Sequence, residues 1–320
     1  MHALQLTMPR SFSQVQLPEP QRSKGILVRL KWAIICGSDM VEFAGKRRSL
    51  RYPLPIGMPI HECVGEVVES TSEMFAPGDF VIAVPDNHQG LCELFVSQGD
   101  SAIHLPDALF DFDGSALVQP LSTVIYAADK LGDVAGHSVA VIGLGPIGQL
   151  FCWLLKLRGA RSVVGIDPSA WRCEFAEQMG ATKTFPMRGL ELVQYVRHKP
   201  DFWEAPDIFI EAAGQQTETI NDCIELVRHN GTVLAFGVPP QPLYPIEYEM
   251  LFRKNLHVIG SVAPHWRTFL PLASELVCQH HAELASLITH RFPVQDVQQA
   301  YTLYEQQGNS LKILLDASQW

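Results

Sequence analysis

The sequence predicts an α/β protein of two domains, one an antiparallel barrel-like unit and the other a doubly wound parallel sheet. Up to about residue 118 it is rich in short β-branched runs interrupted by Gly and Pro, which is typical of strands joined by turns. From about residue 138 apolar strands alternate with helical patterns, which is typical of a parallel sheet covered by helices. A length of 320 residues allows two domains of ordinary size, each with its own core.

Each predicted element rests on a local pattern. In the first region the strands are short apolar runs at 26–30, 64–69 and 79–84. In the second region we expect buried strands at 138–142, 163–167, 207–211 and 232–236, and helices at 149–157 and 172–177. The tail from about residue 264 carries helical patterns and ends in a strand-like run at 312–315.

Composition excludes several classes of protein. Hydrophobic residues make up 47% of the chain and charged residues 18%, as in a globular protein. The formal net charge of −10 argues against a nucleic-acid partner, because such a surface would not neutralise phosphates. The apolar stretch 138–157 has three glycines and a proline near its start. This favours a strand, a turn and a buried helix over a membrane span.

The N-terminus and the cysteines indicate a reducing compartment. The first residues lack the charged and apolar regions of a signal peptide. The seven cysteines are odd in number and form no C-x-x-C, so we expect no disulfide framework. A cytoplasmic location follows as an expectation. Most of the cysteines should be buried and inert, and only Cys36 has a context that suggests chemistry.

A glycine motif, Gly143-Leu144-Gly145-Pro146-Ile147-Gly148, joins a predicted strand to a predicted helix. Gly143 permits a tight turn, Gly145 lets the backbone approach a pyrophosphate, and Gly148 lets the helix pack on the strand. The helix that begins at Pro146 then offers free N–H groups to phosphates, from Ile147 onward. The motif alone is a weak signal, but its place between a strand and a helix predicts a dinucleotide site.

Asp167 ends the next predicted strand, 19 residues beyond Gly148. A carboxylate there accepts hydrogen bonds from the adenosine ribose hydroxyls and repels the 2′-phosphate of NADP. We therefore expect NAD(H) rather than NADP(H). Two alternatives stay open: Asp167 caps the following helix, and Arg172 accommodates a phosphate.

Cys36-Gly37-Ser38-Asp39 and His61-Glu62 lie 25 residues apart in the barrel-like region. A thiolate, an imidazole and a carboxylate together suit Zn²⁺, and three protein ligands leave a fourth position open for chemistry. On spacing alone the signal is weak, because a single Cys and a single His are more often structural residues.

Read as a whole, the chain resembles the zinc-containing medium-chain dehydrogenases, especially their polyol and threonine dehydrogenase branch. The resemblance runs essentially from end to end. Besides the glycine motif and the Cys36 segment, it is carried by residues 57–68, 78–81, 117–123, 236–238, 260–261 and 312–315. It implies a GroES-like catalytic domain made of 1–125 and 262–320, around a Rossmann NAD-binding domain at 126–261.

The resemblance also implies roles for individual residues. Cys36 and His61 would hold one catalytic zinc, with Glu62 as a direct or exchangeable ligand. Ser38 would take the proton of the substrate hydroxyl, and Asp39 would orient His61. Positions expected to line the nicotinamide side of the cofactor are Thr123, Gly237, Val238, Gly260 and Ser261.

The chain departs from the family pattern at four places. Ile60 replaces the usual glycine before His61, Gln119 replaces an acidic residue or cysteine near the metal, and Val41 replaces a relay histidine. The loop with four cysteines that binds a structural zinc is missing, and Cys92 alone cannot build such a site. For Gln119 two interpretations stay open, a hydrogen bond to a zinc-bound water or substrate oxygen, or a tether for its loop.

The sequence thus predicts an oxidoreductase that transfers a hydride between NAD(H) and a small alcohol or carbonyl compound. Its expected partners are this substrate and further copies of itself in a dimer or tetramer, with no nucleic acid and no membrane. Two alternatives remain. One is a metal-free quinone or enoyl reductase on the same scaffold. The other is an NAD(H)-binding protein without catalysis, which Gln119 and Val41 keep open.

Overall fold

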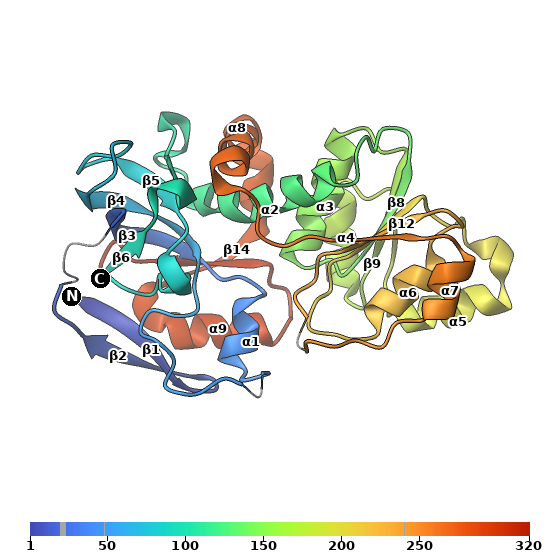
Figure 1. The fold of residues 1–320 in the computed structure, drawn as a ribbon, viewed down its shortest axis with the longest axis horizontal. Helices are drawn as coiled ribbons and strands as arrows, with labels where there is room; N and C mark the ends of the chain where they lie inside the picture. Colours follow the sequence, from blue (N-terminus) through green and yellow to red (C-terminus); the bar gives the residue numbers. More distant parts are fainter. Residues whose placement is uncertain (20–23, 48, 240) are drawn as a thin grey trace. The chain divides into compact units, whose positions relative to one another are not determined.

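The chain divides into two compact units. Unit 1 comprises Met1–Ser122 and Pro264–Trp320, and unit 2 comprises Thr123–Ala263. The computed structural model describes residues 1–19, 24–47, 49–239 and 241–320 (Figure 1). Helix α2 (Val118–Asp129) carries the chain from the first unit into the second. In the described ranges no helix combines the length and the apolar character that a membrane crossing requires.

Unit 1 is built on a seven-stranded, mainly antiparallel sheet. Its order is β14 (Ile288–Pro293), β15 (Lys312–Asp316), β3 (Ile26–Ile34), β4 (Glu62–Ser70), β5 (Phe80–Ala83) and β7 (Ala102–His104), and β6 (Leu94–Ser97) also pairs with β3. Only β14 and β15 run parallel to each other. A separate hairpin joins β1 (His2–Met8) to β2 (Ser11–Gln16). Both ends of the chain therefore contribute strands to one unit.

Unit 1 also contains the helices α1 (Asp39–Phe43), α8 (Trp266–Leu284) and α9 (Val297–Glu305). Of these, α1 and α9 contribute residues to the main core. The fully buried rings of Phe43 on α1 and Tyr301 on α9 lie 5.2 Å apart, centroid to centroid. This aromatic contact ties α1, the helix that follows Cys36, to the C-terminal part of the chain.

Unit 2 is a six-stranded, fully parallel sheet. Its order is β10 (Lys183–Phe185), β9 (Ser162–Ile166), β8 (Ser138–Ile142), β11 (Ile208–Glu211), β12 (Thr232–Ala235) and β13 (His257–Gly260). The doubly wound sheet predicted from the sequence is confirmed. Strand order reverses between β8 and β11, and ligands of such sheets bind in the crevice outside the carboxyl ends at this point.

The helices of unit 2 cover this sheet. They are α3 (Pro146–Leu157), α4 (Ala170–Met179), α5 (Gly189–His198), α6 (Thr219–Leu226) and α7 (Tyr248–Arg253). α3 packs on α4, and α5 packs on α6. Strands β8 and β11 contribute Ile142 and Phe209 to the buried core, which explains their uninterrupted apolar sequences.

Short 3-10 helices interrupt the connections. They lie at Asp86–His88, Gly99–Ser101, Asp107–Leu109, Asp113–Leu117, Pro200–Phe202, Ala285–Leu287 and Val294–Asp296.

Candidate functional site

The strand register of unit 1 brings the three predicted metal ligands together. Cys36 follows β3, and Glu62 begins the neighbouring antiparallel strand β4, opposite Ile34. His61 precedes β4 by one residue. Because an antiparallel pair places the end of one strand beside the start of the next, the 25-residue separation in sequence becomes direct proximity.

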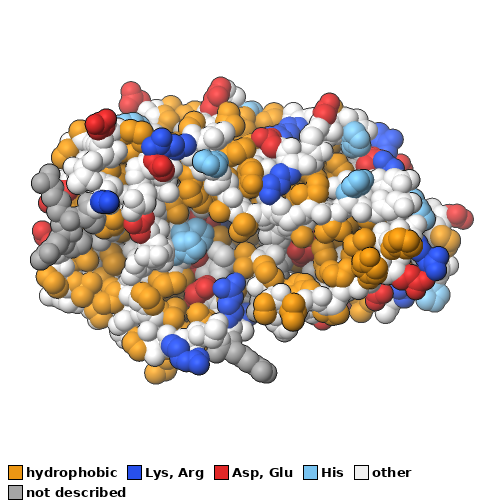
Figure 2. All heavy atoms as spheres, viewed as in Figure 1, with side chains coloured by type: hydrophobic (Ala, Val, Ile, Leu, Met, Phe, Trp, Pro, Cys, Tyr) orange, Lys and Arg blue, Asp and Glu red, His pale blue; other side chains and the backbone are white. Residues whose placement is uncertain are grey.

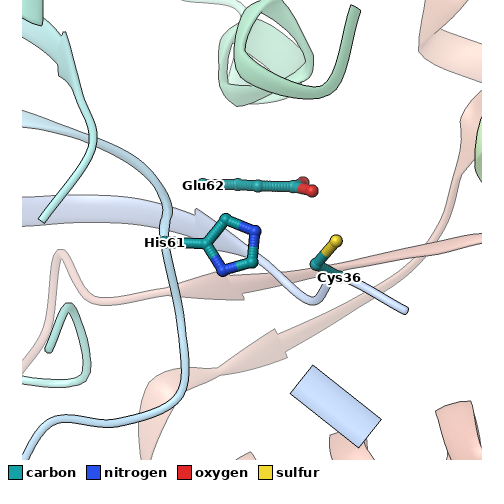
Figure 3. Close-up of side chains that lie close together, drawn as sticks. All are labelled: Cys36, His61 and Glu62. Atoms are coloured by element: carbon teal, nitrogen blue, oxygen red, sulfur yellow. The ribbon is translucent and has the colours of Figure 1, made fainter. Parts of the chain in front are cut away.

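The ligand atoms of Cys36, His61 and Glu62 all lie within 4.8 Å of one another. Figure 3 shows the thiol, the imidazole and the carboxylate directed toward one common space. His61 and Glu62 are only 8% and 0% exposed, so their polar ends are withdrawn from bulk solvent. A soft thiolate, an imidazole and a carboxylate are the ligand set that Zn²⁺ accepts in catalytic sites.

Asp39 contacts two residues of this cluster. Its Oδ1 lies 3.2 Å from Nδ1 of His61, and its Oδ2 accepts the backbone N–H of Cys36 at 2.9 Å. The hydroxyl of Tyr301 donates to the same Oδ2 at 3.3 Å. A carboxylate beside Nδ1 holds the imidazole ring in one orientation.

The negative groups around His61 determine its protonation. Burial lowers the pKa of His61, but the Asp39 carboxylate and the Cys36 sulfur outweigh burial and raise this pKa well above its ordinary value. The surroundings therefore stabilise positive charge at this position, which a divalent cation supplies when the imidazole is neutral.

Lys312 contacts the cluster from the C-terminal end of the chain. Its Nζ lies 2.6 Å from both carboxylate oxygens of Glu62 and donates to the carbonyl of Ile35 at 3.3 Å. Burial lowers the pKa of Lys312, but Glu62 outweighs this and raises the pKa above its usual value. Sequence reasoning assigned residues 312–315 to a strand and missed this contact. A lysine at the start of a buried strand was the available signal.

The remaining residues expected near the metal are distributed around unit 1. Ser38 is half-buried between Cys36 and α1, and Gln119 is buried in the first turn of α2. Val41 lies in the core.

Burial raises the pKa of the Cys92 thiol to about 12, so this sulfur stays protonated at neutral pH. All seven cysteines are free thiols.

One residue of the loop after β5 contacts the cluster. The ring centroids of His88 and His61 lie 4.6 Å apart. Asn87 and His88 both have positive φ angles, 53° and 59°, a conformation that costs energy for residues other than glycine. The loop therefore holds the exposed His88 ring against a buried candidate ligand.

In unit 2 the glycine motif forms the expected turn between β8 and α3. A Cβ on Gly143 would meet Cα of Ala213 at 2.4 Å, and one on Gly148 would meet the carbonyl oxygen of Gly143 at 2.0 Å. At Gly145 a Cβ would meet nothing within 4 Å. Gly145 is also the N-cap of α3 and makes no side-chain cap. There is thus open space beside Gly145 at the start of α3, where the first N–H groups of a helix have no intrahelical partner, as a pyrophosphate site requires.

Asp167 lies directly after β9, beside this turn. Its Oδ2 accepts the N–H of Leu144 and its Oδ1 accepts the N–H of Ser169, both at 2.8 Å. Ser169, not Asp167, is the N-cap of α4. Nη1 of Arg172 lies 3.9 Å from Oδ2 of Asp167, and the buried Nε of Arg172 has no hydrogen-bond partner among the described residues. Asp167 and Arg172, the two residues expected to contact the adenosine ribose or its phosphate, therefore lie next to each other.

The end of β13 and the loops after β12 and β13 hold four of the five positions expected on the nicotinamide side. Gly237 and Val238 follow β12, while Gly260 ends β13 and Ser261 follows it. Because the strands are parallel, these positions share one edge of the sheet with the glycine motif. Within the described ranges the buried hydroxyl of Ser261 has no hydrogen-bond partner. The fifth position, Thr123, lies in α2.

Comparison with known proteins identifies the family. Residues 22–117 match the model of the alcohol dehydrogenase GroES-like domain, and residues 146–277 match that of the zinc-binding dehydrogenases. This chain belongs to the zinc-type medium-chain dehydrogenases. The resemblance and the combination of a GroES-like domain with a doubly wound sheet, both predicted from the sequence, are confirmed.

Named relatives of this dehydrogenase span almost its whole length. It is 27% identical to L-threonine 3-dehydrogenase of Alteromonas mediterranea, over 93% of this chain and 94% of the relative. It is 28% identical to sorbitol dehydrogenase of Gallus gallus, over 93% and 91%. A solved structure of a putative zinc-binding dehydrogenase from Sinorhizobium meliloti 1021 bound to NADP has 27% identity, a TM-score of 0.78 and 98% coverage of both chains. The chain is therefore an oxidoreductase of a family that uses zinc and a nicotinamide dinucleotide.

Proposed function

We propose that this protein is a zinc-dependent dehydrogenase that transfers a hydride between NAD(H) and a secondary alcohol of a polyol, sugar derivative or amino alcohol. The convergence of the Cys36, His61 and Glu62 ligand atoms within 4.8 Å carries the proposal. A metal-free reductase would have no use for a thiol, an imidazole and a carboxylate in one place. The glycine turn before α3 supplies the second requirement, a place for the dinucleotide.

Each residue then has a distinct task. Cys36 and His61 hold zinc, and Glu62 is a direct or exchangeable ligand. Bound zinc supplies Lewis acidity toward the alcohol oxygen, and the nicotinamide carries the hydride. Ser38 accepts the hydroxyl proton of the substrate. Asp39 keeps the imidazole of His61 oriented through its 3.2 Å contact.

The substrate class follows from the relatives and from the site. Two of the relatives are named as dehydrogenases of threonine and of sorbitol. In both compounds a hydroxyl group stands beside other polar groups. The His88 ring lies 4.6 Å from the His61 ring, centroid to centroid, and is exposed, so it offers a polar group close to the proposed metal. A polar secondary alcohol fits these surroundings better than a plain hydrocarbon alcohol.

For the cofactor we propose NAD(H). Asp167 follows β9 beside the glycine turn, and a carboxylate at this position favours a free ribose hydroxyl over a 2′-phosphate. Arg172 lies 3.9 Å from Asp167, and the Sinorhizobium structure contains NADP. A lower KM for NADP than for NAD in the wild-type protein would overturn the proposed preference.

Metal analysis and turnover test the proposal together. We expect about one zinc per chain, because three suitable ligands form one site and the buried Cys92 thiol cannot form another. Cys36→Ser should lose zinc and NADH turnover on a panel of polyols, amino alcohols and their ketones, whereas the matched control Cys92→Ser should keep both.

Other outcomes distinguish the rivals. Turnover of quinones or enones by protein that never held zinc would establish the metal-free reductase. NADH binding without turnover of any compound would establish a binding protein. Two zincs per chain would show a second metal site.

We also propose that the protein forms a homo-oligomer through unit 2. β13 is an edge strand, and Val258 on it is 46% exposed. Large apolar side chains nearby in sequence are exposed as well, namely Leu243, Tyr248, Phe252 and Val262. Figure 2 shows hydrophobic side chains gathered over the region that carries α6 and α7 in Figure 1. An unpaired edge with apolar neighbours favours pairing with a second copy. The molar mass in solution, measured by light scattering, tests this, and a monomer at micromolar concentration refutes it.

A further inference from the structure

Glu211 ends β11 with a buried carboxylate that joins two loops. The side chain is only 6% exposed. Its Oε1 accepts the N–H groups of Ala213 at 3.1 Å and Gly214 at 3.2 Å, and the hydroxyl of Thr219 at 2.9 Å. Its Oε2 accepts the N–H of Gly237, in the loop after β12, at 3.2 Å. One carboxylate thus connects the loop 212–215 with the loop 236–238.

These two loops approach each other too closely for a side chain to separate them. A Cβ on Gly237 would meet the nitrogen of Gly214 at 2.4 Å and Oε2 of Glu211 at 2.5 Å. The N–H of Gln215 also donates to the carbonyl of Val238 at 2.8 Å. Gly237 is therefore required for the contact, and Glu211 satisfies the backbone N–H groups that the contact buries.

The loop 212–215 also meets the glycine turn. The hypothetical Cβ of Gly143 lies 2.4 Å from Cα of Ala213, so the backbones of the two segments are in contact. Glu211 consequently lies between the segment proposed for the pyrophosphate and the segment that carries Gly237 and Val238. This is the carboxyl edge of β8, β11 and β12, at the reversal of strand order.

We propose that Glu211 is a positioning residue that fastens the loop of Gly237 and Val238 to the loop 212–215 and so sets the nicotinamide half of the cofactor site. This inference rests on the proposed function, because it takes Gly237 and Val238 as nicotinamide-side positions. Hydride transfer requires the ring to be held in one orientation, and a loop fixed before binding supplies that at little entropic cost. The contact of the Glu211 carboxylate with the N–H of Gly237 is called the latch below. The adenosine half of the site, assigned to the glycine motif and Asp167, does not depend on this contact.

Glu211→Gln tests the latch with little change in shape. The amide oxygen takes the place of Oε1, which serves three donors, and the NH₂ group then faces the N–H of Gly237. Two donors then face each other, which weakens the hold of residue 211 on the loop 236–238. The backbone bonds from Phe236 and Gly237 to the carbonyl of residue 211, both at 3.0 Å, remain, so the loop is loosened and not detached. The matched control is Thr219→Val, which removes a donor that belongs to neither loop.

Two measurements separate the latch from a general loss of structure. In calorimetric titration, Glu211→Gln should weaken NADH binding by about tenfold and leave ADP-ribose, which lacks the nicotinamide, within about twofold of wild type. Without any cofactor, backbone hydrogen exchange in residues 236–238 should become faster. Thr219→Val should leave the ratio of NADH to ADP-ribose affinity unchanged.

The other possible outcomes contradict either the proposed role of Glu211 or the proposed function. Wild-type NADH affinity in Glu211→Gln, or an equal loss of NADH and ADP-ribose affinity, overturns the latch. A wild-type protein that binds neither ligand overturns the proposed function instead, and hydrogen exchange then still tests the loop contact. If Glu211→Gln does not fold, Gly237→Ala forces the same loops apart from the other side and should give the same selective loss of NADH. Equal affinities there count against the proposal.

Discussion

The ammonium group of Lys312 lies 2.6 Å from both carboxylate oxygens of Glu62, and both side chains are almost completely buried. A lysine is thus paired with the very carboxylate that we propose as a direct or exchangeable zinc ligand. Removing one partner of a buried ion pair leaves an uncompensated charge, which is far more costly than removing both.

Lys312→Met should therefore destabilise the zinc-free protein by about 3–5 kcal/mol. With zinc present the loss should be smaller, because the cation can then neutralise Glu62 in place of the ammonium group. Thermal unfolding with chelator and with added zinc measures both effects. Lys312→Arg keeps the charge and should behave more like wild type. An unfolding temperature that is unchanged without zinc would show that the pair contributes nothing.

Asp167→Ser should shift cofactor preference toward NADP. The carboxylate that repels the 2′-phosphate is removed, and Arg172, 3.9 Å away, becomes available to contact it. We expect the ratio of kcat/KM for NADP to that for NAD to rise by about tenfold. The measurement is initial rates with each cofactor, and Arg172→Ala in the same background should reverse the gain. A wild-type enzyme that already prefers NADP would defeat the assignment and make Arg172 the phosphate contact.

Gln119→Glu should retain zinc and change the pH profile. Under the interpretation that Gln119 contacts a zinc-bound water or substrate oxygen, a carboxylate adds negative charge beside the metal. The metal then becomes a weaker Lewis acid, and the apparent pKa in the profile of kcat/KM against pH moves upward. Metal content is measured on the same samples. If metal content and profile both match wild type, Gln119 only tethers the loop at the start of α2.

Asp222→Asn should stabilise the protein at neutral pH. Burial, with Glu225 and Glu218 nearby, raises the pKa of Asp222 to about 6 in the folded state, against about 3.9 for an unfolded aspartate. The folded state therefore binds this proton more tightly, and stability is lost as pH rises from about 4 to 6. At pH 7 we expect a gain of about 1–2 kcal/mol in the free energy of unfolding, allowing for residual solvation.

The pH dependence distinguishes this effect from a simple change in packing. At pH 3 the aspartate is protonated in both states, so Asp222→Asn and wild type should unfold at the same urea concentration. The exposed Asp201→Asn is the control and should have no effect at either pH. A gain at pH 3 as large as at pH 7 would contradict the electrostatic explanation.

The sequence by itself determined what short segments decide. The strand runs of unit 2 are apolar because both faces of a parallel sheet are covered, so their pattern predicted β8, β9, β11 and β12 without reference to the rest of the chain. The glycine motif could be placed between strand and helix for the same local reason. Strand β13 escaped prediction because, as an exposed edge strand, it lacks that uniformly apolar pattern.

Only the tertiary structure decided which distant groups meet. Lys312 is 250 positions from Glu62, and Tyr301 is 262 positions from Asp39. The strand order β15–β3–β4 and the packing of α9 on α1 create these contacts. In the same way, the sequence shows Glu211 only as the last residue of an apolar run. The parallel pairing of β11 with β12 brings the N–H of Gly237 to its carboxylate. Local patterns specify elements, but pairing between strands far apart in sequence specifies which charges are buried together, and no segment encodes that alone.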